Sequence, residues 1–390
     1  MSFITLDNKD WCKGVYHDGR LHFEQIPENL DRTWKYCSYL ENKKIEYAAI
    51  YAMGKNIEQV CPSNLSDEWK LNKSRLEAYH SSFKEAKISL EENCFFDLVP
   101  KQFLLEICNT KCKIIDYVID NFEKPKNYEM LLAVEKIISQ IERQELNLDL
   151  KMLKSNMTNV RARNLLKKLN KTSKIKYNLF GSKTGRLTTS QNTFPILNLD
   201  KEFRSIIKPN NDLLVELDFN SAEVRVLFAL SNKQQPEGDV HNWNAKRFSI
   251  SREEAKKEIF AWLYGSSKID SSKYEKWFST KQVIEQYYSN ECIVNPFGRK
   301  IKTDDFHKMN HLIQSTTADM VFEQVIKVNE LLKNKKSFVS FMVHDSVVID
   351  LAKEELEIVK YLLNEFTNTR FGKIAANISA GKDYGSLRRI

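Results

Sequence analysis

The sequence lacks long apolar runs and contains few residues that interrupt helices. Only 11 glycines and 8 prolines occur among its 390 residues, and no stretch reaches the roughly 18 apolar residues of a membrane-spanning helix. The first residues carry charges, such as Asp7 and Lys9, where a secretory signal needs an apolar core. We therefore expect a cytoplasmic chain that has no membrane as partner. At roughly 150 residues per domain, its length allows about two or three domains.

Cysteine usage argues against a zinc site or a disulfide framework. The seven cysteines are odd in number, and no two of them have the C-x-x-C spacing. They stand at positions 12, 37, 61, 94, 108, 112 and 292. We expect reduced thiols, with Cys108 and Cys112 packing on an apolar helix. His307 and His311 are four residues apart without an evident third ligand, which favours a helix-surface pair over zinc.

The composition is that of a folded protein with much helix. Hydrophobic residues make up 42% and charged residues 29% of the chain, which argues against disorder. No glycine occurs between Lys55 and Phe180, so this stretch should be largely helical. Apolar residues recur every three or four positions over 101–122 and 128–146, which predicts two amphipathic helices interrupted at Pro125.

The first 62 residues have a different pattern. Short apolar runs at Phe3–Leu6 and Ile45–Ala52 flank an expected helix at Leu30–Leu40. We interpret the amino-terminal part of the chain as a small α/β unit of unknown role.

Positive charge is concentrated in one stretch. Lys and Arg total 60 against 52 Asp and Glu, a formal net charge of +8. Residues 151–177 include nine Lys or Arg and no Asp or Glu. Such a charge run is either a solvated helix face or an arm that follows phosphates, and the missing acids favour the arm.

Two aspartates follow predicted strands. Residues 213–218 alternate like a half-buried strand before a predicted helix at 221–231, so Asp218 ends a strand. Residues 338–343 and 347–351 read as a hairpin with His344, Asp345 and Ser346 at its turn. Each aspartate alone reads as an ordinary turn residue, but two carboxylates on adjacent strand ends are able to hold two Mg²⁺ ions about 4 Å apart.

A third feature is a helix predicted at residues 252–264. Arg252, Lys256, Phe260 and Tyr264 recur every four residues and therefore lie on one helix face, with Gly265 ending the helix. Cations bind phosphates and rings stack on bases, so this face suits a nucleoside triphosphate. The alternative is an amphipathic helix whose two rings belong to the core.

These residues resemble the motifs of the family A DNA polymerases. Asp218-Phe-Asn-Ser-Ala-Glu223-Val-Arg225 is similar to motif A, the 252–265 helix to motif B and His344-Asp345 to motif C. Further similar stretches are Thr184-Gly-Arg-Leu-Thr-Thr-Ser190 with Pro195 and Asn198, Gly238-Asp-Val-His241, Pro296-Phe-Gly-Arg-Lys300, Asn310 to Asp319 and Ser379 to Tyr384. The resemblance covers roughly residues 175–390 in the family's order.

The resemblance implies an α+β right-hand polymerase, with an antiparallel palm sheet and largely helical thumb and fingers. The implied parts are an amino-terminal unit at 1–90, a thumb with a basic tip at 91–180, palm at 181–231, fingers at 232–305 and palm again at 306–390. The implied activity is template-directed DNA synthesis by two-metal-ion nucleotidyl transfer. The implied partners are primer-template DNA and deoxynucleoside triphosphates, whereas no processivity factor is indicated.

The resemblance also implies roles for individual residues. Asp218, Asp345 and the carbonyl of Phe219 would bind two Mg²⁺ ions, and Lys256 would act as a general acid toward pyrophosphate. Arg252 and His241 would bind the outer phosphates, Phe260 would stack on the incoming nucleotide, Tyr264 would lie beside the templating base, and Glu223 would block a ribose 2'-hydroxyl. The implied DNA contacts are Arg186, Asn198, Asn310, Gln314 and His344, with Arg161, Arg163, Lys167 and Lys168 in the basic stretch.

Several departures leave alternatives open. Ser346 stands where most DNA-synthesising members have Glu, Phe219 replaces a Tyr, and the stretch from Gly265 to Pro296 is short. His344-Asp345-Ser346 and the Ser266-Ser267 that follows motif B also resemble single-subunit RNA polymerases, although Glu223 favours deoxynucleotides. A scaffold that binds primed DNA without extending it is the other alternative.

Two activities are expected to be limited. Residues 1–100 contain no Asp-x-Glu, the metal-binding signature of the family's proofreading exonuclease, so we expect no 3'-5' exonuclease. Phe260, where some members have Tyr, implies discrimination against dideoxynucleotides.

Overall fold

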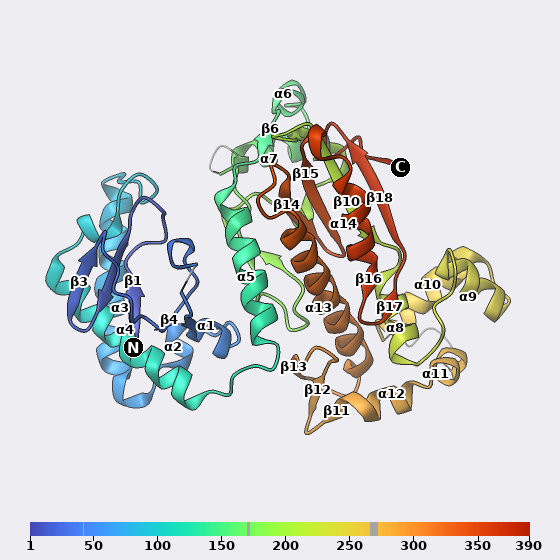
Figure 1. Ribbon diagram of the computed structural model, residues 1–390, viewed down its shortest axis with the longest axis horizontal. Helices are drawn as coiled ribbons and strands as arrows, with labels where there is room; N and C mark the ends of the chain where they lie inside the picture. The colour runs from blue at the N-terminus through green and yellow to red at the C-terminus, as the bar shows by residue number, and fades with distance from the viewer. Residues whose placement is uncertain (42, 170–171, 266–271) are drawn as a thin grey trace. The chain divides into compact units, whose positions relative to one another are not determined.

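The computed structural model describes residues 1–41, 43–169, 172–265 and 272–390, which form two compact units (Figure 1). The first unit is Met1–Leu132 and the second is Ala133–Ile390. The boundary predicted near residue 90 falls inside the first unit because α4 (Lys101–Asn121) packs against β1 (Phe3–Thr5) and α1 (Ala48–Tyr51). The predicted limits of thumb, palm and fingers remain predictions.

The first unit combines a small antiparallel sheet with helices. Strands β1, β2 (Gly14–His17) and β3 (Arg20–Phe23) pair in that order. Its other elements are α2 (Ile57–Val60), η2 (Ser63–Leu65), α3 (Ser66–Glu85) and η3 (Phe95–Asp97), while α5 (Tyr128–Arg143) crosses the boundary between the units. Helices α4 and α5 confirm the two predicted amphipathic helices, and Cys108 and Cys112 are buried on α4 as expected.

The helix expected at Leu30–Leu40 is wrong. Residues Arg32–Thr33 form strand β4, which pairs in parallel with β5 (Glu46–Tyr47), and only the 3-10 turn η1 (Ser38–Leu40) is helical. Leu30, Tyr36, Cys37 and Leu40 are nevertheless buried. These apolar residues are buried although much of the segment is extended. Pairing of β4 with β5 supplies backbone hydrogen bonds that a helix would otherwise supply.

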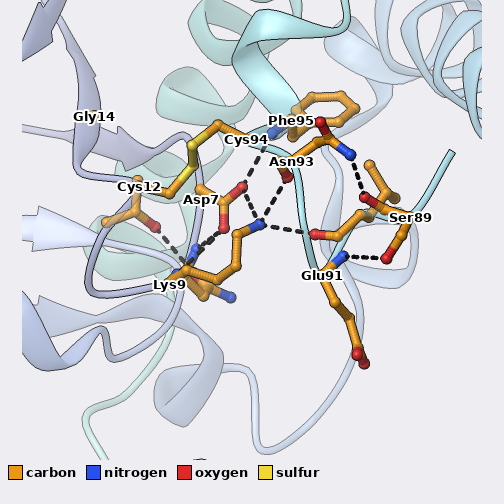
Figure 2. Close-up of polar contacts among 12 residues, drawn as sticks. Asp7, Lys9, Cys12, Gly14, Ser89, Glu91, Asn93, Cys94 and Phe95 are labelled. Carbon is orange, nitrogen blue, oxygen red and sulfur yellow. Dashed lines mark hydrogen bonds and ion pairs between the residues drawn. A yellow bond between two sulfur atoms is a disulfide. The ribbon is translucent and has the colours of Figure 1, made fainter.

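The expectation of reduced thiols is wrong for one pair. A disulfide joins Cys12 to Cys94, 82 residues apart in the chain (Figure 2). Beside it, Lys9 Nζ lies 2.8 Å from Asp7 Oδ2 and 2.8 Å from the carbonyl oxygen of Leu90, and the Phe95 amide donates to Asp7 at 3.1 Å. The loop after β1 is thus tied to the segment before α4 by both covalent and polar bonds.

The second unit is built on a five-stranded antiparallel sheet of order β14-β15-β10-β18-β19. These strands are Phe338–Val343, Ser346–Leu351, Leu213–Phe219, Ala376–Gly381 and Arg388–Arg389, respectively. Helix α14 (Ile358–Thr367) packs on β10 and β18, and the long, largely buried α13 (Lys308–Leu331) packs on α14 and α8 (Ala222–Leu230) (Figure 1). The strands and helices predicted around both aspartates are confirmed.

Shorter elements complete the second unit. Its remaining helices are α6 (Lys151–Ser155), α7 (Val160–Leu169), η4 (Ile196–Asn198), η5 (Lys201–Ile206), α9 (Val240–Phe248), α10 (Arg252–Leu263), α11 (Ser272–Phe278), α12 (Thr280–Tyr287) and η6 (Lys353–Glu355). Its remaining strands are β6 (Asn147–Leu148), β7 (Tyr177–Asn178), β8 (Thr188–Thr189), β9 (Ile207–Lys208), β11 (Tyr288–Ser289), β12 (Cys292–Val294), β13 (Lys300–Lys302), β16 (Asn368–Thr369) and β17 (Gly372–Lys373).

The predicted α+β class is confirmed by an antiparallel main sheet with helices packed against it. Among the described residues, no helix is both long enough and apolar enough to cross a membrane.

Candidate active site

The structure places the two predicted metal-binding aspartates side by side. Asp218 near the end of β10 is the register partner of Ser346, the residue after Asp345. The amide of Phe219 also donates to the carbonyl oxygen of Asp345 at 3.4 Å. Because register partners in antiparallel strands have Cα atoms about 4.5–5.5 Å apart, both aspartates lie well within a nanometre of each other.

The turn that carries Asp345 is tight. Strand β14 ends at Val343 and β15 begins at Ser346, so His344 and Asp345 alone form the loop. His344 has φ +52°, a left-handed conformation that two-residue hairpin turns require. Ser346, expected in the turn, is instead the first buried residue of β15. The short loop keeps the Asp345 carboxylate close to the ends of β14 and β15.

The aspartates lie in a site with excess negative charge. Burial and, after it, the nearby carboxylates of Glu216 and Asp345 raise the pKa of Asp218 to about 7, although a hydrogen bond with Asn377 opposes the shift. Burial also raises the pKa of Asp345, and the Arg186 guanidinium opposes that shift. A cation placed between the two aspartates would remove the repulsion between them.

The site suits Mg²⁺ better than a metal held by protein ligands alone. Among the described residues, no group of three or more His, Cys, Asp or Glu is placed to hold a metal ion. Mg²⁺ commonly uses one or two carboxylates and completes its octahedron with water and substrate phosphates. Two carboxylates, Asp218 and Asp345, fit this pattern, and Phe219 supplies a nearby backbone carbonyl.

A second cluster joins three predicted site residues from distant segments. Glu223, in the first turn of α8, is 5% exposed and accepts hydrogen bonds from the Arg186 guanidinium and from Tyr264 Oη, the latter at 3.0 Å. Asp345 acts electrostatically on both Glu223 and Arg186. The Glu223 carboxylate is therefore held by two side chains and lies near Asp345.

The residue before Arg186 packs against a buried ion pair. Gly185 has φ +82°, and a Cβ there would lie 2.5 Å from the Arg299 guanidinium carbon. Arg299 in turn donates to Asp319 at 2.6 Å, and both side chains are almost fully buried. The close approach of Gly185 to Arg299 explains why this position needs glycine.

Helix α10 presents the predicted stripe outward. Ser251 and Glu254 form a capping box at its start, and Gly265 with φ +77° follows its end, as predicted. The buried residues of the helix are Ala255, Ile259 and Leu263. The stripe of Arg252, Lys256, Phe260 and Tyr264 lies on another face: Lys256 is exposed and Tyr264 is 49% exposed. The alternative in which both rings belong to the core is therefore wrong.

The phosphate-binding candidates Arg252 and His241 already have protein partners. Arg252 Nη2 lies 2.7 Å from Asp239 Oδ2, while Asp239 Oδ1 caps the start of α9. His241 is 3% exposed, and its Nε2 lies 3.0 Å from Ser221 Oγ. Burial lowers the pKa of His241, and the nearby cations Lys256, Arg252 and Arg225 lower it further, whereas Asp239 raises it. Phosphate binding by these two side chains thus requires that Arg252 exchange partners.

The predicted DNA-contacting residues lie on several elements. Asn198 is exposed at the end of η4, and Asn310 and Gln314 are partly exposed one turn apart near the start of α13. Helix α7 buries Ala162, Leu165 and Leu169 and exposes four predicted cations, Arg161, Arg163, Lys167 and Lys168. Asp200 lies 3.6 Å from Arg161, so part of this charge is balanced in space.

Some predicted features lie elsewhere. Ser266 and Ser267, which prompted the comparison with RNA polymerases, lie outside the described residues. His307 and His311 lie at the start of α13, and their Nδ1 atoms contact Asp304 and Thr303 at 2.7 Å each. These contacts agree with the predicted surface pair.

The structure adds residues to the site that sequence reasoning did not select. Glu216 and Asn377 act on Asp218, and Asp239 holds Arg252. Glu216 carried a readable signal, because residues two apart on a strand share a face, and Asp239 stands in the Gly238–His241 stretch of the resemblance.

Polymerases are found among proteins similar in sequence. The DNA polymerase of Mycobacterium phage L5 is 24% identical over 183 residues, 40% of this chain and 30% of that protein. DNA polymerase I of Caldicellulosiruptor bescii is 26% identical over 289 residues, 59% of this chain and 34% of that protein. The chain thus matches about a third of the length of these relatives. No family model matches the sequence.

The fold has a solved counterpart. The polymerase domain of Pol1 from M. smegmatis, in complex with DNA primer-template and dNTP, matches with a TM-score of 0.64 over 88% of this chain and 83% of that chain, at 14% identity. The fold is therefore that of a polymerase domain. Together with the polymerases that are similar in sequence, this fold supports the resemblance to family A DNA polymerases drawn from the motifs.

Proposed function

We propose that the chain is a template-directed DNA polymerase that adds deoxynucleotides to a primer 3' end. The observation that carries this proposal is the arrangement of Asp218 and Asp345 with the Arg186–Glu223–Tyr264 cluster and the partly exposed stripe of cations and rings on α10. The named relatives and the structural neighbour support it. Primer-template DNA and deoxynucleoside triphosphates are the proposed partners.

The proposed reaction is nucleotidyl transfer. The 3'-oxygen of the primer attacks the α-phosphorus and loses its proton to solvent, a new P–O bond forms, and the bond to the pyrophosphate oxygen breaks. Lys256, exposed on α10, donates a proton to the departing pyrophosphate. Two Mg²⁺ ions bound by Asp218, Asp345 and the Phe219 carbonyl would activate the attacking oxygen and neutralise the phosphates.

The remaining side chains position the nucleotide and the DNA. Arg252 and His241 bind the outer phosphates, and Phe260 stacks on the incoming nucleotide. Glu223 is held by Arg186 and Tyr264, so its carboxylate is rigid enough to exclude a ribose 2'-hydroxyl. Arg186, Asn198, Asn310, Gln314 and His344 contact the primer-template, and the cations of α7 bind its phosphates.

Primer extension with Mg²⁺ tests the proposal directly. The wild-type chain should extend a primer with deoxynucleotides, should reject ribonucleotides and should not trim a mismatched primer end. Asp345→Ala should abolish extension while primer-template binding remains. Preferential use of ribonucleotides would favour the RNA polymerase alternative, and binding without extension would favour the scaffold.

A further inference from the structure

Glu216 lies on the same face of the main sheet as the proposed metal site. It precedes Asp218 by two residues on β10, and side chains two apart on a strand share a face. The register partner of Asp218 is Ser346, and that of Glu216 is Val348. Ser346 Oγ lies 3.2 Å from Glu216 Oε1, so it can donate a hydrogen bond diagonally across the two strands.

The Ser346 hydroxyl is buried and has few hydrogen-bond acceptors within reach. The side chain is 4% exposed, and the other acceptor within reach of its hydroxyl is the Val343 carbonyl oxygen at 3.0 Å. Val343 and Ser346 flank the two-residue turn that holds Asp345. Glu216 therefore contacts the base of the turn and also faces Asp218.

The same contact bears on the departure noted at position 346. Where the sequence resembles motif C, the resemblance implies a Glu at this position, whereas this chain has Ser. On the neighbouring strand, the Glu216 carboxylate lies within hydrogen-bond distance of the Ser346 hydroxyl. Three carboxylates thus lie at this end of β10 and β15, those of Glu216, Asp218 and Asp345.

We propose that Glu216 is a positioning residue of the polymerase site and takes over, from the neighbouring strand, the place of the acid missing at position 346. It holds Ser346, and through it the turn of Asp345, and its negative charge strengthens divalent-cation binding by Asp218 and Asp345. This inference rests on the proposed function. Arg204 also acts electrostatically on Glu216, so the competing account is an acid that only balances Arg204.

Relocating the carboxylate distinguishes the two accounts. Glu216→Ser should weaken Mn²⁺ binding to the DNA-free protein, measured by calorimetry, by about tenfold, as expected for an outer-sphere residue. It should also raise the Mg²⁺ concentration needed for half-maximal primer extension. The double variant Glu216→Ser with Ser346→Glu should recover most of both losses, because the carboxylate returns to the same end of the sheet.

Asp350 provides the matched control. It is a buried acid of the same sheet, on β15, and it accepts hydrogen bonds from the Asn210 and Asn211 amides at the end of that strand away from the turn. Asp350→Asn should lower the melting temperature and leave Mn²⁺ affinity unchanged. Glu216→Ser with wild-type Mn²⁺ affinity would overturn the proposal, and so would a folded double variant that recovers nothing. A wild-type chain that fails to extend primers would refute the function instead, while Mn²⁺ binding still decides the role of Glu216.

Discussion

Asp218 lies half-buried at the end of β10, where two other carboxylates act on it. The site therefore stores repulsion in the absence of a cation, which is expected where function requires closely placed like charges. The burial of Asp218 and the neighbouring carboxylates favour cation binding, and they lower the stability of the metal-free protein.

Asp218→Asn should therefore stabilise the metal-free protein and abolish primer extension. We expect the free energy of unfolding in a chelator to rise by about 0.5–2 kcal/mol, the usual range when an unfavourable functional charge is removed. Urea denaturation measures this. Added Mg²⁺ should stabilise the wild type and leave the variant unchanged, and a variant less stable than the wild type in chelator would contradict the account.

Glu223 provides a second test at the scale of the residue. Glu223→Ala removes the side chain proposed to block the 2'-hydroxyl, so ribonucleotide incorporation relative to deoxynucleotide should rise by at least about tenfold, or 1.4 kcal/mol. Glu223→Gln keeps the size of the side chain and its bond with Tyr264 Oη. It should therefore keep sugar discrimination. Single-nucleotide extension measures the ratio, and equal discrimination in the alanine variant would refute the assignment.

At the scale of the element, motifs distant in sequence support one another. The glycine of the Thr184-Gly-Arg stretch packs on Arg299, and Arg299 is held by Asp319 of α13. Three stretches of the family resemblance thus meet beneath Arg186. Gly185, Arg299 and Asp319 therefore pack against one another and support the segment that carries Arg186, rather than each contacting substrate.

Gly185→Ala should disturb this arrangement. Alanine would have to adopt the strained φ of +82°, and its Cβ would displace the Arg299 guanidinium. We therefore expect the free energy of unfolding to fall by about 1–3 kcal/mol and primer extension to be slower. Gly372 is the matched control, because its φ is +87° and nothing lies within 4 Å of an added Cβ. Gly372→Ala should show the backbone strain alone, with normal extension. Equal effects of the two variants would show that the contact with Arg299 is unimportant.

At the scale of the whole molecule, the chain consists of two compact units, of which the second contains all the proposed catalytic residues. The first unit is closed by the disulfide between Cys12 and Cys94. A cross-link over 82 residues restricts the unfolded chain considerably, and both of its cysteines belong to the first unit.

Cys12→Ser should lower the stability of the first unit by about 2–4 kcal/mol. Calorimetry with and without a reductant measures this, and the wild type in reductant should behave like the variant. Cys292→Ser, in the second unit, is the control. Its melting should respond to reductant in the same way as that of the wild type. A melting curve of the wild type that does not change in reductant would count against the disulfide.

The local patterns predicted much of what was found. The apolar periods of α4 and α5, the alternation of β10, β14 and β15 and the capping signals of α10 are properties of neighbouring residues, which a sequence displays directly. The expected helix at 30–40 failed because β4 pairs with β5, and such pairing is invisible to a local period.

The sequence by itself determined the helices and strands around the site and which of these strands end in an acid. Only the tertiary structure decided which side chains meet: Glu216 with Ser346, Arg252 with Asp239 and Cys12 with Cys94. The physical reason is that hydrophobic period and turn chemistry act over a few residues. A hydrogen bond, an ion pair or a disulfide instead forms between whichever groups the packed elements bring within about 3 Å, however far apart they stand in the chain.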